Sequence, residues 1–411
     1  MRNTLRNMKS ALLLNDSHLW GVWTYSALSQ ANLLFDPILS EEIDEDFSNK
    51  YRALFVPGGW SKNKLASLDR KAKDTLRDFV EKGGIYVGIC GGASLACEEG
   101  LGFLKIRRSR ERIPSYSGPC RVKVIKEHPL FKNIRNCLFF LWFPPKFEIH
   151  DETVQVLGYF WEATPQAFVS DLCLKDHWKN LEHFERKYRI PLDPKKMIGS
   201  PLIMEGSLKK GKVLLSLIHF DTPQFKNGSI LIENIIKYYQ LPIVKSRPTK
   251  ALDLKKLISK NKNFPTKDVS FIYREFKNLF ERVKEILSYA QRNFLFYRRT
   301  SYFYQWKRGI RGLELLNLFF MLDEILKCLA KEQISELTLE ILCGSIEEVK
   351  NLTNVVLEAL RQEYESFRNG DPFGRHNQAA EIFGDNLKSY GGLYRILINY
   401  LERFLVYLWR N

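Results

Sequence analysis

Largely apolar runs separated by helical stretches are the feature of this sequence that most limits its fold. Four such runs occupy residues 11–14, 53–56, 85–89 and 213–218. Between the second and third, residues 69–82 carry apolar side chains at helical spacing and end at a Gly-Gly pair. Strands without polar alternation are typical of a parallel sheet with helices on both faces. Residues 1–240 are therefore predicted to form an α/β domain.

The pattern changes after residue 240. Residues 241–267 are rich in lysine and punctuated by prolines, which predicts a basic linker. From residue 268 to residue 411 the apolar residues recur at helical spacing in four stripes. This second region is predicted to be an all-α helical bundle domain.

Charge and cysteine content limit the environment and the partners. Lys and Arg number 63 and Asp and Glu 47, a net charge of +16 that allows an anionic partner without selecting one. No apolar run approaches the roughly 20 residues of a transmembrane segment, and residues 11–14 are too short for a signal peptide core. The seven cysteines include no CxxC pair. Free thiols fit a reducing compartment, so the chain is expected to be cytoplasmic.

A cysteine lies where a buried strand is predicted to turn into a helix. Gly88-Ile89-Cys90-Gly91-Gly92 joins the run at residues 85–89 to a predicted helix. A nucleophile at such a position needs a tight, strained turn, and neighbouring glycines allow this turn because they have no side chain. The helix would aim its positive end at the sulfur and so favour the thiolate. Cys90 is therefore the predicted nucleophile.

Glycines are placed to assist it. The amide of Gly91, and that of Gly59 at the end of the preceding strand, are predicted donors to a developing oxyanion. Gly58 and Gly92 lack side chains, so they are predicted to border the bound substrate.

A base is expected at the same edge of the sheet. His219 follows the run at residues 213–218, at the carboxyl end where α/β sheets bind their ligands. Asp221 would lie on the same side of an extended segment and orient the imidazole. Asp16 and His18 follow the first run and are predicted substrate contacts.

Taken together, these motifs resemble the class I glutamine amidotransferase-like superfamily. Residues 53–96 are most similar to the domain found at the N-terminus of eukaryotic biotin–protein ligases and in free-standing bacterial proteins. The resemblance covers roughly residues 10–240. It implies a flavodoxin-like parallel sheet and a triad of Cys90, His219 and Asp221.

Three departures from the family matter. The segment between Gly102 and Lys212 lacks a clear glutamine-binding signature. The family usually has Glu in the position held by Asp221, and the shorter side chain predicts a looser or water-mediated bond to the imidazole. The Gly-Arg-rich adenylate loop of the ligase catalytic domain is absent from the sequence, so ligation of biotin is not expected.

The function expected from these residues is cysteine-dependent hydrolysis of a C–N amide bond in a small molecule or peptide. It requires neither a metal nor an organic cofactor. The alternative is a non-catalytic ligand-binding or scaffold protein. In that case the basic helical domain would bind a protein partner, nucleic acid or a membrane, or associate with itself.

Residues 294–311 interleave aromatic and basic side chains. Such a mixture suits stacking on bases or contact with an anionic membrane face. It equally suits an amphipathic helix whose Arg and Lys stems cover apolar neighbours, and a bundle helix is the structure predicted for this segment.

Overall fold

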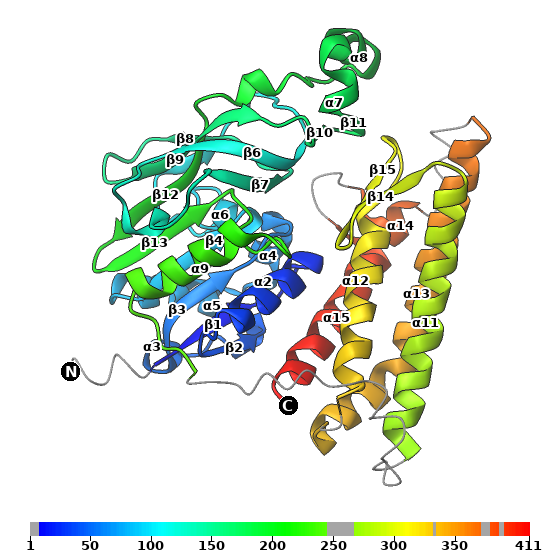
Figure 1. Ribbon diagram of the computed structural model, residues 1–411. Helices are drawn as coiled ribbons and strands as arrows, with labels where there is room; N and C mark the ends of the chain where they lie inside the picture. Colours follow the sequence, from blue (N-terminus) through cyan, green and yellow to red (C-terminus); the bar gives the residue numbers. More distant parts are fainter. Residues whose placement is uncertain (1–7, 245–266, 332–333, 371–378, 386–389) are drawn as a thin grey trace. The chain divides into compact units, whose positions relative to one another are not determined.

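A computed structural model describes residues 8–244, 267–331, 334–370, 379–385 and 390–411 of the chain (Figure 1). The contacts divide it into two compact units, Met1–Pro242 and Ile243–Asn411. Most of the predicted basic linker, residues 245–266, lies outside the described residues.

The first unit is built on a parallel sheet with the strand order β2-β1-β3-β4-β13. All four neighbouring pairs in this series are parallel. The order matches that of a flavodoxin-like sheet, so the predicted fold class is confirmed. The strands are β1 Lys9–Leu13, β2 Phe35–Ile38, β3 Tyr51–Val56, β4 Ile85–Ile89 and β13 Gly211–Ser216.

Helices cover both faces of the parallel strands. α2 (Leu19–Gln30) packs against α9 (Lys226–Tyr238) over one face. The right-handed connection from β3 to β4 carries α5 (Arg70–Glu81) to the other face. Asp69 caps α5 by accepting a hydrogen bond from the amide of Ala72 at 2.7 Å. The buried side of α5 carries the apolar residues that its spacing predicted.

Antiparallel strands extend this sheet beyond β13, in a region where no strand was predicted. Their order is β13-β12-β9-β6-β10-β11, with β7 also paired to β6. The strands are β6 Tyr116–Val124, β7 Leu138–Trp142, β9 Gln155–Ala163, β10 Phe168–Val169, β11 Leu172–Cys173 and β12 Pro201–Leu208. Two short strands, β5 (Ile106–Arg108) and β8 (Phe147–Ile149), form a separate pair. The parallel sheet is thus the core of a larger mixed sheet.

The second unit has four long helices in its described residues, as the four apolar stripes predicted. They are α11 Lys267–Arg292, α12 Leu313–Leu329, α13 Glu336–Arg368 and α15 Gly392–Trp409, with a short α14 at Ala379–Phe383. Packing joins α11 to α12 and α13, and α15 to α12 and α13, around an apolar core. No helix in the described part of the chain is both long and apolar enough to cross a membrane.

The prediction of a helix within residues 294–311 is wrong. Strands β14 (Phe296–Thr300) and β15 (Phe303–Trp306) form an antiparallel hairpin there. Phe296 and Phe303 are buried, while Arg298 between them in sequence is exposed. The helical unit is therefore not entirely α, because a two-stranded sheet interrupts the bundle sequence.

Candidate active site

Cys90 occupies a strained turn between β4 and α6 (Gly91–Leu95). Its φ of 50° and ψ of −99° are unfavourable for a residue with a side chain. The turn is held by hydrogen bonds from the Cys90 amide to the Ser216 carbonyl (2.7 Å) and from the Ser94 amide to the Cys90 carbonyl (2.9 Å). The half-buried thiol contacts the carbonyl oxygen of Trp142 at 3.7 Å. Strained strand-to-helix turns of this kind present the nucleophile in α/β-hydrolases.

The glycines around Cys90 are required by close backbone packing. A Cβ atom at Gly91 would collide with the carbonyl oxygen of Gly59, and one at Gly92 with that of Val56. The loop after β3 therefore lies directly against the turn after β4. Among the described residues, the amides of Gly59 and Gly91 donate no hydrogen bond to the protein. Both predicted oxyanion donors are thus available in the same small region.

His219 and Asp221 lie in direct contact, in a local geometry that differs from the expected one. Residues 219–222 form a tight turn, with the Thr222 amide donating to the His219 carbonyl at 3.2 Å. They are not extended, as the sequence interpretation assumed. The turn brings Asp221 Oδ1 to 3.0 Å from His219 Nδ1. The prediction of a looser or water-mediated bond is therefore wrong, because the turn compensates for the shorter side chain.

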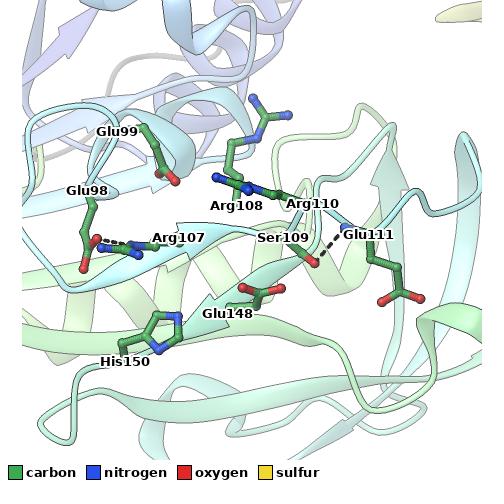
Figure 2. A pocket seen from close by; sticks show the side chains of 9 residues that line it. All are labelled: Glu98, Glu99, Arg107, Arg108, Ser109, Arg110, Glu111, Glu148 and His150. Atoms are coloured by element: carbon green, nitrogen blue, oxygen red, sulfur yellow. Dashed lines mark hydrogen bonds and ion pairs between the residues drawn. The ribbon is translucent and has the colours of Figure 1, made fainter.

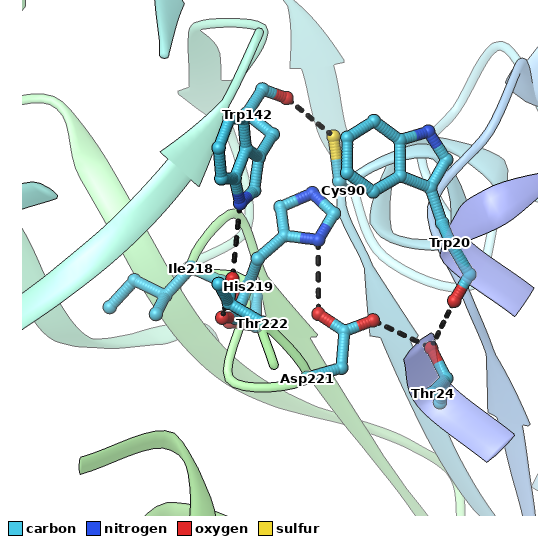
Figure 3. A network of polar contacts seen from close by, with 9 residues as sticks. Trp20, Thr24, Cys90, Trp142, Ile218, His219, Asp221 and Thr222 are labelled. Carbon is cyan, nitrogen blue, oxygen red and sulfur yellow. Dashed lines mark hydrogen bonds and ion pairs between the residues drawn. The ribbon is translucent and has the colours of Figure 1, made fainter. Parts of the chain in front are cut away.

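The imidazole of His219 lies between the Cys90 sulfur and the Asp221 carboxylate (Figure 3). Both residues of the His–Asp pair are buried. Burial alone would lower the pKa of His219, but the Asp221 carboxylate and then the Cys90 side chain raise it to about 9. Nε2, the nitrogen not bonded to Asp221, has no hydrogen-bond partner among the residues described. The ring is therefore expected to be an imidazolium at neutral pH, with a proton available on the side of the sulfur.

A surrounding layer of residues, which the sequence interpretation did not identify, fixes this arrangement. The Thr24 hydroxyl lies 2.6 Å from Asp221 Oδ2. Trp142 donates from Nε1 to the Thr222 hydroxyl at 3.0 Å, and Thr222 donates to the His219 carbonyl at 2.8 Å. The Trp20 ring centroid lies 5.0 Å from that of the imidazole. These side chains come from α2, β7 and the turn, so no sequence spacing links them.

The predicted substrate contacts differ in their surroundings. A Cβ atom at Gly58 would lie 3.1 Å from Cε1 of His219, so Gly58 borders the imidazole. Gly92 is engaged internally, since its amide donates to the Pro57 carbonyl at 3.1 Å and its carbonyl accepts from the Tyr86 hydroxyl at 2.7 Å. Their contact with a substrate stays a prediction.

The loop after β1 lies against the same region. The carbonyl oxygen of Asp16 occupies the space that a side chain at Gly59 would need. The Asp16 carboxylate is buried and accepts a hydrogen bond from the Ser67 hydroxyl at 2.6 Å. His18 is buried at the start of α2, with a φ of 58°. Substrate contact by these two residues also stays a prediction.

The family comparison concerns the strand–turn–helix region just described. Residues 34–121 match the family model for the N-terminal region of biotin-protein ligase. This match confirms the resemblance to that family over these residues. The matched segment contains Gly59 and Cys90 and ends before His219.

Several solved structures are similar to this chain at low sequence identity. A protein described as a putative GMP synthase subunit, from Thermoplasma acidophilum, has a TM-score of 0.37 at 10% identity, covering 57% of this chain and 94% of its own. PurLQS from Thermotoga maritima has a TM-score of 0.40 at 12% identity, with coverages of 56% and 98%. A structure described as glutamine amidotransferase has a TM-score of 0.36 at 18% identity, with coverages of 56% and 99%. No curated protein matches the chain.

A hollow elsewhere in the first unit is lined by charged side chains (Figure 2). It has a volume of about 700 Å³ and is lined from β5, β8 and adjoining loops by Glu98, Glu99, Arg107, Arg108, Ser109, Arg110, Glu111, Glu148 and His150. Arg107 is paired with Glu98 within this lining. None of the predicted site residues lines this hollow. Among the described residues there is also no group of three or more His, Cys, Asp or Glu side chains that could hold a metal ion.

Proposed function

We propose that the first unit is a glutamine amidotransferase-like cysteine hydrolase that cleaves a C–N amide bond. The observation that carries the proposal is the buried His219 imidazole, which lies between the Cys90 sulfur and the Asp221 carboxylate. The resemblance of residues 34–121 to the biotin-protein ligase N-terminal family supports the same site, since it includes the cysteine turn.

In the first half of the proposed reaction, the Cys90 thiolate attacks the amide carbonyl carbon and forms a C–S bond. The carbonyl oxygen gains the negative charge, and the amides of Gly59 and Gly91 donate hydrogen bonds to it. The His219 imidazolium then protonates the leaving nitrogen as the C–N bond breaks. The products of this half are a free amine or ammonia and a thioester on Cys90.

In the second half, water hydrolyses the thioester. Neutral His219 accepts a proton from the attacking water, and Asp221 stabilises the imidazolium that forms. The C–S bond breaks, which releases a carboxylic acid and restores the thiolate beside the protonated ring. Sulfur, imidazole and backbone amides supply each of these steps, so the proposal requires no metal and no organic cofactor.

Selective alkylation tests this proposal. Iodoacetamide near neutral pH, read out by peptide mass spectrometry, compares Cys90 with the other six cysteines of the same molecule. Burial raises the pKa of Cys97 and of Cys328 to about 12, so both are internal controls for slow labelling. We expect Cys90 to be modified first, and His219→Ala to slow it by at least about tenfold.

Uniformly slow labelling of all seven cysteines would instead favour the alternative class, a binding or scaffold protein without a nucleophile. A second measurement separates reactivity from turnover. Release of ammonia from a panel of primary amides, lost in Cys90→Ala, is the result expected of an amidohydrolase.

A further inference from the structure

We infer that Thr24 is a positioning residue for the proposed triad, acting through Asp221. The inference rests on the proposed function. Thr24 lies on α2, far from Asp221 in the sequence, yet its hydroxyl oxygen is 2.6 Å from Asp221 Oδ2 (Figure 3). Both side chains are buried.

The two oxygens of the Asp221 carboxylate have separate partners. Oδ1 faces His219 Nδ1 at 3.0 Å, and Oδ2 faces Thr24. An ionised carboxylate only accepts hydrogen bonds, and burial makes an unsatisfied oxygen costly. The Thr24 hydroxyl therefore holds the Asp221 carboxylate in the orientation that places Oδ1 against the imidazole.

The Thr24 hydroxyl has a competing acceptor. It also lies 2.9 Å from the carbonyl oxygen of Trp20, one helical turn earlier, which is an ordinary contact for a threonine within a helix. A hydroxyl carries a single hydrogen. The contact to Asp221 is shorter and its acceptor is charged, so the hydrogen is assigned to the carboxylate.

Loss of the Thr24 hydroxyl should lower the reactivity of the Cys90 sulfur through the Asp221 carboxylate and the His219 imidazole, which lie between them. Thr24→Val keeps the shape of the side chain but leaves Oδ2 without its donor. The carboxylate then stabilises the His219 imidazolium less, and the imidazolium in turn stabilises the Cys90 thiolate less. Thr24→Ser retains a hydroxyl and should restore most of the effect.

The test measures the rate of Cys90 alkylation by iodoacetamide from pH 6 to pH 10 in the full chain. For Thr24→Val we expect a rate about tenfold below that of the parent protein at pH 7. The difference should close above about pH 9, because His219, whose pKa is raised to about 9, then loses its proton in the parent protein as well. Thr24→Ser should stay within about threefold of the parent. In an Asp221→Asn background, Thr24→Val should cause no further loss.

Thr164→Val is the matched control. Thr164 is also buried in this unit, but its hydroxyl donates to the Pro119 carbonyl at 2.8 Å. Its replacement should therefore leave the alkylation rate of Cys90 unchanged.

The inference is overturned if Thr24 has only a structural role, limited to its contact with the Trp20 carbonyl. In that case Thr24→Val would lower thermal stability but leave the pH dependence of Cys90 alkylation unchanged. If Cys90 of the parent protein reacts no faster than the other cysteines, the proposed function itself fails. If Cys90 is fast in the parent and equally fast in Thr24→Val, only the role of Thr24 fails.

Discussion

The carboxylate of Asp221 reaches the imidazole of His219 across a single tight turn, with Oδ1 3.0 Å from Nδ1. Because the turn is closed by the Thr222 amide, the distance is fixed by local backbone and does not depend on a long side chain. We expect Asp221→Asn to slow alkylation of Cys90 at pH 7 by about tenfold to a hundredfold, since a neutral amide cannot stabilise the imidazolium. Asp171→Asn, on a partly exposed carboxylate between β10 and β11, is the control and should leave the rate unchanged.

Stability should depend on pH through His219. Its pKa is raised to about 9 in the folded protein, against an ordinary value of 6.5. The stabilisation is therefore fully present below about pH 6.5 and is lost as the pH rises through about 9. Urea unfolding should give a free energy that falls between pH 6 and pH 9.5 by on the order of 3 kcal/mol more than in His219→Gln. His183→Gln, at an exposed position, should keep the slope of the parent protein; equal slopes in all three proteins would contradict the prediction.

The close packing around Gly91 predicts that alanine destabilises the protein at this position but not at Gly344. Gly91→Ala should lower the free energy of unfolding by about 2–3 kcal/mol, because its methyl group would collide with the Gly59 carbonyl. Gly344 lies inside α13, and apart from its own helix backbone no atom of the described residues comes within 4 Å of the position of a Cβ. Gly344→Ala should instead raise the free energy of unfolding by up to about 1 kcal/mol. Chemical denaturation of both variants checks the pair, and equal effects would mean that the two loops are not packed as described.

The strained backbone at Cys90 predicts that two variants lacking the thiol differ in stability. Cys90→Gly and Cys90→Ala both lack the thiol, but only glycine accepts a φ of 50° without strain. We expect Cys90→Gly to be more stable than Cys90→Ala by about 1 kcal/mol. Thermal unfolding of the two proteins side by side measures the difference. A more stable alanine variant would show that the turn relaxes in solution.

Local patterns were sufficient to predict four strands of the parallel sheet and the strand–turn–helix at Cys90, whereas the parallel edge strand β2 (Phe35–Ile38) was not predicted. The run at residues 85–89 is apolar throughout, and the glycines that follow it leave few alternatives for the backbone. The four helices of the second unit were predicted for the same reason, because their apolar stripes persist over many turns.

Elements whose pattern depends on distant partners were not predictable. β6 contains Gly118 and Pro119, which interrupt a strand pattern, yet the strand pairs with β7, β9 and β10. The hairpin at residues 296–306 mixes aromatic and basic side chains in a way that also fits a helix face. Thr24 gives no signal at all, since a threonine within a helix acquires meaning only when Asp221 folds against it.

The contact between the loops after β3 and β4 has a consequence for recognising proteins that share this site. A Cβ at Gly91 would collide with the Gly59 carbonyl, and a Cβ at Gly59 would collide with the Asp16 carbonyl, so a substituent at either position displaces the backbone around the cysteine turn. A homologous sequence that keeps the cysteine but carries a larger residue at position 91 cannot hold this conformation. Homologues to assay should therefore be chosen by the presence of glycine at both positions 59 and 91, which is a stricter criterion than the presence of the cysteine alone.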